Sequence, residues 1–253
     1  MIAVAPGAAS RITPATIELD ELPVPVRLKP NTRARRFTLR LDQTGESAVL
    51  TLPPGISGSE IRMFLIRNAA WLEGALNRKP RPVIVAPGTV LPLGGEPLLI
   101  VQTSGPRRAP RVETGRLLVQ GTGHVGRRVR AFLRDRARSS LVPAAHHYAG
   151  LLGRQVRSVA IRDTRSRWGS CTTLGTLSFS WRLAMAPGPV IDYVAAHEAA
   201  HLIEMNHGPR FWALLGSLVP EFETHRSWLK NEGRELHAYR FEYVGSDPTP
   251  TGR

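Results

Sequence analysis

The sequence predicts an α+β protein, with short strands concentrated in its first half and helices in its second half. Apolar and polar residues alternate in residues 33–41 and again in residues 177–183, which is the pattern of half-buried strands. In residues 61–78 and 127–152 apolar residues instead recur every three or four positions, as on the core-facing side of a helix. With 253 residues and 42% hydrophobic content, the chain can bury a sizeable core.

The first half is predicted to be an extended arm followed by a β-rich region with one helix. Frequent prolines in residues 1–32 leave room for little regular structure. Ser57 and Glu60 have the spacing of a capping box, which predicts a helix start. The predicted elements are a short strand near residues 21–28, a hairpin of residues 33–41 and 48–52, a helix over residues 61–78, and small strands between residues 81 and 120.

The second half is predicted to be mainly helical, with two strands between its first and second helices. A run rich in Pro, Thr and Gly at the C-terminus predicts a disordered tail. The predicted elements are a helix over residues 127–152, strands over residues 156–162 and 177–183, a helix over residues 190–205, a helix starting at Pro209, and a last amphipathic helix over residues 221–239.

The chain is strongly basic, with a formal net charge of +14, and the charge is unevenly distributed. Residues 1–150 hold 22 basic against 10 acidic side chains, whereas residues 151–253 hold 12 against 10. Because a basic surface attracts phosphates, nucleic acid is one expected partner of the first half. A solvated basic surface explains the same charge, and no recognised nucleic-acid module accompanies it.

The composition predicts a cytoplasmic protein. No stretch approaches the roughly 18 continuous apolar residues of a membrane helix, and Pro6 and Gly7 interrupt the N-terminus, so no signal peptide or membrane segment is expected. The single cysteine, Cys171, excludes an intramolecular disulfide and zinc sites built from several thiolates. It lacks the partner pattern of a nucleophile and is expected to be a buried structural thiol.

The most informative stretch is residues 195–207, which contains the pattern His-Glu-x-x-His. His197 and His201 are four residues apart, so on a helix their imidazoles project from one face and can hold one metal ion. Glu198 can face a water molecule at that metal without binding the metal itself, which is the position of a general base. The pattern is typical of the metal helix in zinc hydrolases.

His207 is the expected third ligand, provided that the helix ends before it. Asn206 tolerates the left-handed conformation that often closes helices, and Gly208 and Pro209 prevent helical continuation. The chain can then turn and bring His207 back to the metal. Three histidines with one open position are typical of catalytic zinc sites.

Two alternatives remain open at this point. The five-residue pattern also occurs by chance in helices where one histidine is an ordinary core residue. A carboxylate from a later helix, Glu221 or Glu223, could also serve as third ligand. We prefer His207 because it needs only a local turn.

Several short motifs resemble the YgjP-like metallopeptidases, which are relatives of the SprT-like and WLM proteases. The resemblance is dense from about Asp163 to Trp228 and weaker in residues 33–41 and 61–76. Ala199 departs from the usual Glu-Leu-Ala of the family, although the histidines are intact. The motifs are SRWGSC at residues 166–171, WRL at 181–183, DYV at 192–194, HE at 197–198, HL at 201–202, EMNH at 204–207 and FW at 211–212.

The resemblance implies a zincin-like fold with zinc on His197, His201 and His207, and with Glu198 as catalytic base. The implied activity is zinc-dependent cleavage of peptide bonds, and the SprT-like relatives suggest substrates attached to DNA. An alternative is a zinc-containing binding module without turnover. The predicted domains are an arm over residues 1–32, a β-rich accessory region over residues 33–125, a zincin-like domain over residues 126–243, and a disordered tail over residues 244–253.

The surroundings of the metal helix are less determined by the sequence. The strand over residues 177–183 either pairs with an extended peptide substrate or has both edges occupied, because periodicity does not reveal pairing. Trp168 and Trp181 are expected as walls of a cleft or as core. Tyr193, Arg165 and Arg167 are neighbours that could stabilise an oxyanion, and we assign none of them that role.

Overall fold

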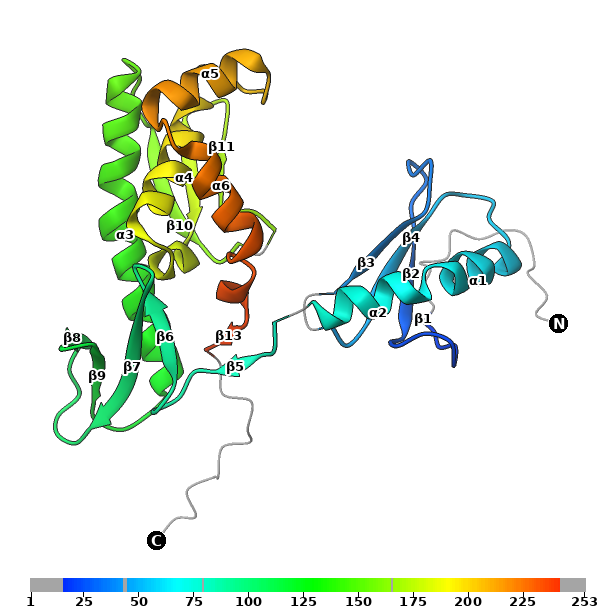
Figure 1. The fold of residues 1–253 in the computed structure, drawn as a ribbon, viewed down its shortest axis with the longest axis horizontal. Helices are drawn as coiled ribbons and strands as arrows, with labels where there is room; N and C mark the ends of the chain where they lie inside the picture. The colour runs from blue at the N-terminus through cyan, green and yellow to red at the C-terminus, as the bar shows by residue number, and fades with distance from the viewer. Residues whose placement is uncertain (1–15, 43–44, 79, 165, 242–253) are drawn as a thin grey trace, which may run out of the picture. The chain divides into compact units, whose positions relative to one another are not determined.

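The computed structural model describes residues 16–42, 45–78, 80–164 and 166–241, and the chain divides into two compact units (Figure 1). The first unit ends at Lys79 and the second begins at Pro80. Each unit buries its own set of apolar side chains and contains both helices and sheets, in agreement with the predicted α+β class. The division falls inside residues 33–125, which were expected to form one region. The predicted tail lies outside the described residues.

The first unit is a four-stranded sheet with two helices packed on the apolar side of its strands. The sheet has the order β1–β2–β4–β3, in which β2 and β4 are parallel and the other pairs antiparallel. Leu50 of the central strand and Leu65 and Leu72 of the helices are fully buried together. The elements are β1 (Thr16–Ile17), β2 (Val26–Pro30), β3 (Thr38–Leu41), β4 (Ala48–Leu52), α1 (Gly58–Arg67) and α2 (Ala69–Asn77).

The predicted hairpin is confirmed, because β3 and β4 pair antiparallel. The capping box is also confirmed, since Ser57 Oγ accepts from the Glu60 backbone N–H and the Glu60 carboxylate accepts from the Ser57 N–H. The helix predicted over residues 61–78 is instead two helices, because the Asn68 side chain donates to the Phe64 carbonyl at 2.8 Å and interrupts the helix. Within the predicted arm, Val26 is fully buried in β2.

The second unit contains three small sheets and four helices among the described residues. Its strands and helices are β5 (Val83–Ile84), β6 (Val90–Leu93), β7 (Glu96–Thr103), β8 (Arg111–Glu113), β9 (Arg116–Gln120), α3 (Val125–Leu151), β10 (Ser158–Arg162), β11 (Gly169–Cys171), β12 (Thr176–Ser180), α4 (Gly188–Ala200), α5 (Pro209–Leu218), α6 (Phe222–Asn231) and β13 (Tyr239–Arg240). Short 3₁₀ turns cover Trp181–Met185 and Glu235–His237.

The 27-residue helix α3 supports the rest of this unit. It packs against α4, the 3₁₀ turn after β12 and the sheet that contains β10 (Figure 1). Its buried stripe, with Val129, Leu133 and Leu141 fully buried, has the spacing that predicted a helix. No helix in the described part of the chain is both long enough and apolar enough to cross a membrane.

A three-stranded sheet lies beside α4 and has the order β10–β12–β11. The strand predicted over residues 177–183 ends at Ser180, because the next five residues are all buried and form a 3₁₀ turn. Both edges of β12 are occupied, so of the two alternatives left open by the sequence the structure shows the second, a sheet strand with both edges paired. The outer strand β11 contacts α4 instead.

Candidate metal centre

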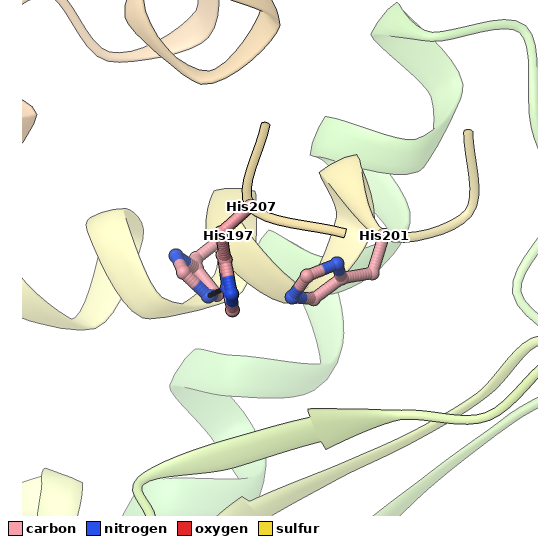
Figure 2. A group of neighbouring side chains, drawn as sticks. All are labelled: His197, His201 and His207. Atoms are coloured by element: carbon pink, nitrogen blue, oxygen red, sulfur yellow. Dashed lines mark hydrogen bonds between the residues drawn. The ribbon is translucent and has the colours of Figure 1, made fainter. Parts of the chain in front are cut away.

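The structure brings His197, His201 and His207 together (Figure 2). His197 lies in the last turn of α4, His201 follows the helix directly, and His207 lies in the loop before α5. One ring nitrogen from each histidine lies within 4.8 Å of those of the other two. Nε2 of His197 and Nε2 of His207 face each other at 3.0 Å.

The turn that brings His207 back differs from the predicted one. The helix ends at Ala200, not near Met205, and Asn206 is not among the described residues with positive φ. The N–H groups of residues 202–204 donate to the carbonyls of residues 199 and 200 at 2.9–3.0 Å, which tightens the last turn. The early end allows the following loop to fold back. Pro209 then begins α5, as predicted.

Neighbouring groups orient two of the three imidazoles. His201 Nδ1 is 2.9 Å from the Glu204 carbonyl oxygen, which can only accept, so Nδ1 is the donor of this hydrogen bond and Nε2 is the nitrogen left for a metal. The Trp212 indole N–H donates to the His207 carbonyl at 3.0 Å, and the indole stacks on the His207 ring. Phe211, fully buried, stacks on His201.

The electrostatics of the cluster favour the neutral imidazole at His197 and His207, which is the form that binds metals. Burial lowers the pKa of His197 to about 3, and the other two histidines and Arg226 act in the same direction. Burial also lowers the pKa of His207. His197 Nδ1 is buried and has no hydrogen-bond partner among the described residues.

The donor set therefore fits a metal ion held by three imidazoles with an open position. Among the described residues, the group of side chains that could hold a metal consists of these three histidines. Glu221 and Glu223, the alternative third ligands, do not belong to it and are exposed.

Glu198 lies beside the histidines and is 5% exposed. Burial raises the pKa of its carboxyl group to about 8, although the positive charge of Arg167 opposes the shift. The carboxyl group lies against Gly169 of β11: a Cβ added there would be 2.6 Å from Glu198 Cγ and 2.7 Å from Cδ. No role was expected for Gly169 from the sequence, because the SRWGSC motif contains a glycine but does not show which distant side chain lies against it.

These residues line an open cleft of about 410 Å³ between α4 and β11. Of the residues singled out from the sequence, Tyr193, Arg167 and Trp168 line the cleft, whereas Trp181 is a core residue and Arg165 lies outside the described residues. The cleft is lined by residues 167–171, Tyr193, Val194, His197, Glu198, His201, Met205, His207 and Leu229.

Cys171 lies on the wall of this cleft and is half-buried, instead of being part of the core as predicted. Burial raises the pKa of its thiol to about 11, and Glu198 adds to the shift. The thiol donates to the Thr172 carbonyl at 3.3 Å. A neutral thiol is a poor nucleophile, in agreement with the expectation that Cys171 is not a catalytic nucleophile.

A buried carboxyl group next to three imidazoles in an open cleft defines a candidate metal-dependent hydrolase. The chain belongs to the YgjP-like metallopeptidases, because the family model described as "YgjP-like, metallopeptidase domain" matches residues 35–232. This match confirms the resemblance noted from the short motifs.

A solved structure described as "Crystal structure of the metallopeptidase zymogen of Pyrococcus abyssi abylysin" is also similar. The two chains are 22% identical, and the alignment covers 36% of this chain and 95% of that chain, with a TM-score of 0.31. At that TM-score the likeness does not define the fold of this chain. No match is found among curated proteins.

Proposed function

We propose that this protein is a zinc-dependent peptidase in which Glu198 is the general base. The observation that carries the proposal is the buried Glu198 carboxyl group next to the three histidines in an open cleft. Membership of a metallopeptidase family supports the same reaction.

His197, His201 and His207 would hold the zinc ion. The Nε2 atoms of His197 and His207 are 3.0 Å apart, and one ring nitrogen of each of the three histidines lies within 4.8 Å of those of the other two, which supports a shared ion. Zinc, when bound, supplies Lewis-acid chemistry: it lowers the pKa of water and polarises a carbonyl group.

Glu198 would accept a proton from the attacking water and pass it to the leaving amine. Its position suits both steps, because the carboxyl group is held against the Gly169 backbone and faces the cleft. Arg167 provides a positive charge that favours the ionised carboxylate.

The substrate backbone would lie along β11. Among the described strands β11 pairs only with β12, so its outer edge can offer backbone groups to an extended peptide. Gly169, Ser170 and Cys171 of this strand all line the cleft. A strand edge beside a metal helix also supports the zincin-like fold that we propose for residues 126–243.

Replacing Glu198 by Gln tests the proposed mechanism. We expect casein cleavage to fall by at least about 100-fold, the usual order for a lost general base, while zinc content measured by mass spectrometry stays at one ion per chain. Glu223→Gln, an exposed change on α6, is the control and should cleave normally. Parent-like cleavage by Glu198→Gln would refute the assigned base.

A zinc-containing module without turnover is the alternative, and cleavage assays with and without a chelator separate it from a peptidase. Chelator-sensitive digestion of casein or of a crosslinked protein is the result expected of the peptidase. Failure to digest any such substrate, in a preparation that contains zinc, would favour the binding module.

A second candidate function, nucleic-acid binding by the first unit, has one specific observation in its favour. Arg33, Arg35, Arg36 and Arg40 line one hollow of about 520 Å³ without an acidic residue among the lining side chains. Binding of labelled duplex DNA through these arginines should fall steeply between about 50 and 200 mM salt. No binding at the lower salt concentration would remove DNA from the candidate partners.

A further inference from the structure

A second hollow, of about 220 Å³, adjoins the cleft of the candidate active site. Arg167, Trp168 and Leu229 line both. Ser166, Lys230, Arg234 and His237 complete the lining of the second hollow. A peptide in the cleft can therefore place a side chain into this hollow without leaving the surface of the protein.

One wall of the hollow is formed by residues 230–237, which pack against Trp168. The Trp168 ring packs on the His237 ring with 4.8 Å between centroids. A Cβ at Gly233 would lie 2.9 Å from Trp168 Cζ2, so the backbone after α6 approaches the indole as closely as only glycine allows. The buried Arg182 guanidinium donates to the Leu236 carbonyl at 3.1 Å and holds the same segment.

The charge of this hollow is positive and is not neutralised by its own lining. Arg167, Lys230 and Arg234 form no ion pair with the residues that the structure describes. Glu232 and Glu235 belong to the same segment but do not line the hollow. The lining of the hollow thus contains three exposed cationic side chains and no described carboxylate.

We propose that this hollow, the basic subsite, binds an acidic side chain of the peptide substrate, Asp or Glu, within a few residues of the bond that is cleaved. The inference rests on the proposed peptidase function. Guanidinium groups pair with carboxylates through two parallel hydrogen bonds, and the Trp168 wall packs against the methylene groups of the same side chain. A Lys or Arg side chain would meet like charges there, so basic residues are disfavoured at that position.

Binding of matched peptides to full-length Glu198→Gln protein tests the basic subsite without requiring cleavage. Fluorescence anisotropy would compare labelled peptides that differ only by Glu, Gln or Lys at one position, with that position scanned along the peptide. At one position we expect the Glu peptide to bind about tenfold more tightly than the Gln peptide, the order expected of two or three partly exposed ion pairs. The Lys peptide should bind more weakly than both.

Charge reversal at the subsite should abolish this preference. In the Glu198→Gln background, Arg234→Glu and Lys230→Glu should each bring the Glu and Gln peptides within about twofold of each other, and together they should favour the Lys peptide. Arg116→Glu, the same charge change at an exposed position of β9, is the matched control and should keep the full preference. Circular dichroism verifies that each variant is folded.

The outcomes distinguish the subsite from the proposed function. Equal binding of Glu and Gln peptides at every position would overturn the basic subsite, and so would a Glu preference that survives Arg234→Glu and Lys230→Glu together. If the Glu preference is present but the parent protein cleaves none of these peptides, the subsite stands and the peptidase proposal fails. Cleavage by the parent protein without any preference for acidic peptides would support the peptidase proposal and contradict the basic subsite.

Discussion

The contact between Gly169 and Glu198 controls where the proposed general base lies. Gly169 lies in the edge strand β11 and Glu198 lies in the helix α4. Because glycine has no side chain, the Glu198 carboxyl group occupies the space that a Cβ at position 169 would fill. A larger residue at position 169 would meet the Glu198 carboxyl group first, because the three atoms nearest to an added Cβ all belong to Glu198.

We therefore predict that Gly169→Ala separates catalysis from metal binding. A displacement of about 1 Å at a reacting group can cost about 100-fold in rate, so peptide cleavage should fall by that order while zinc content is unchanged. Gly150→Ala in α3 is the control, because a Cβ there meets nothing within 4 Å and the activity should stay at the parent level. Parent-like kcat in Gly169→Ala would show that this contact does not position the base.

The raised pKa of Glu198 predicts a pH-dependent stability when a chelator keeps metal away. Burial raises this pKa from 4.5 to about 8, so between these values the folded state binds one proton more than the unfolded state. The resulting stabilisation is complete below pH 4.5 and is lost as the pH rises to about 8.

Glu198→Gln, neutral at every pH, lacks this loss. In urea unfolding with chelator, the free energy of unfolding of the variant minus that of the parent should increase steadily from pH 5 to pH 8. Burial, the other two histidines and Arg226 lower the pKa of His197, and none of these causes involves Glu198, so the contribution of His197 is expected to cancel in the difference. A difference that does not change with pH would show that Glu198 is already ionised in the folded protein.

Arg182 connects the 3₁₀ turn after β12 to residues 236–239 near the end of the described chain. It is 4% exposed, donates to the carbonyls of Leu236 and Tyr239 at 3.1 and 3.4 Å, and lies over the Trp181 ring. Asp163 is 3.7 Å from its Nε atom. Charge-assisted hydrogen bonds of a buried side chain are among the stronger contributions to stability, so this one residue fixes several elements.

Arg182→Met should lower the free energy of unfolding of the second unit by about 2–4 kcal/mol, because two carbonyls lose a charged donor. Arg154→Met, at an exposed position, should change it by less than about 0.5 kcal/mol. Urea unfolding followed by tryptophan fluorescence provides the measurement. Equal stability of the two variants would mean that Arg182 does not hold this segment.

The two units have separate cores, and this separation predicts two unfolding transitions. Leu50 belongs to the core of the first unit and Leu133 to that of the second, and both are fully buried. Leu50→Ala and Leu133→Ala should each lower the stability of the unit that contains the residue by about 2–5 kcal/mol and leave the unfolding transition of the other unit unchanged. Calorimetry of the two variants measures this.

Zinc should stabilise only the transition of the second unit, since all three histidines belong to it. At a free zinc concentration about 1,000 times Kd the gain is about 4 kcal/mol, and a chelator should remove it. A single transition that moves with both Leu→Ala variants and with the chelator would show that the units unfold together.

The features determined by the sequence alone are those that depend on neighbours along the chain. The capping box of Ser57 and Glu60 joins residues three positions apart, the hairpin of β3 and β4 joins residues 7 to 13 positions apart across one turn, and the structure confirms both. The four-residue spacing of His197 and His201 likewise predicted that their side chains share one face of a helix, and the family motifs were recognisable without any structure.

The tertiary structure decided the features that depend on residues distant in the chain. Strand pairing enclosed β12 and left β11 at the edge beside the cleft. The contact of Gly169 with Glu198 and the packing of Trp168 against Gly233 have no local signal, since periodicity shows which face is apolar but not which segment covers it. The physical reason is that local hydrogen bonding and side-chain period are set by nearby residues, whereas the walls of a cleft are set by which distant segments pack together.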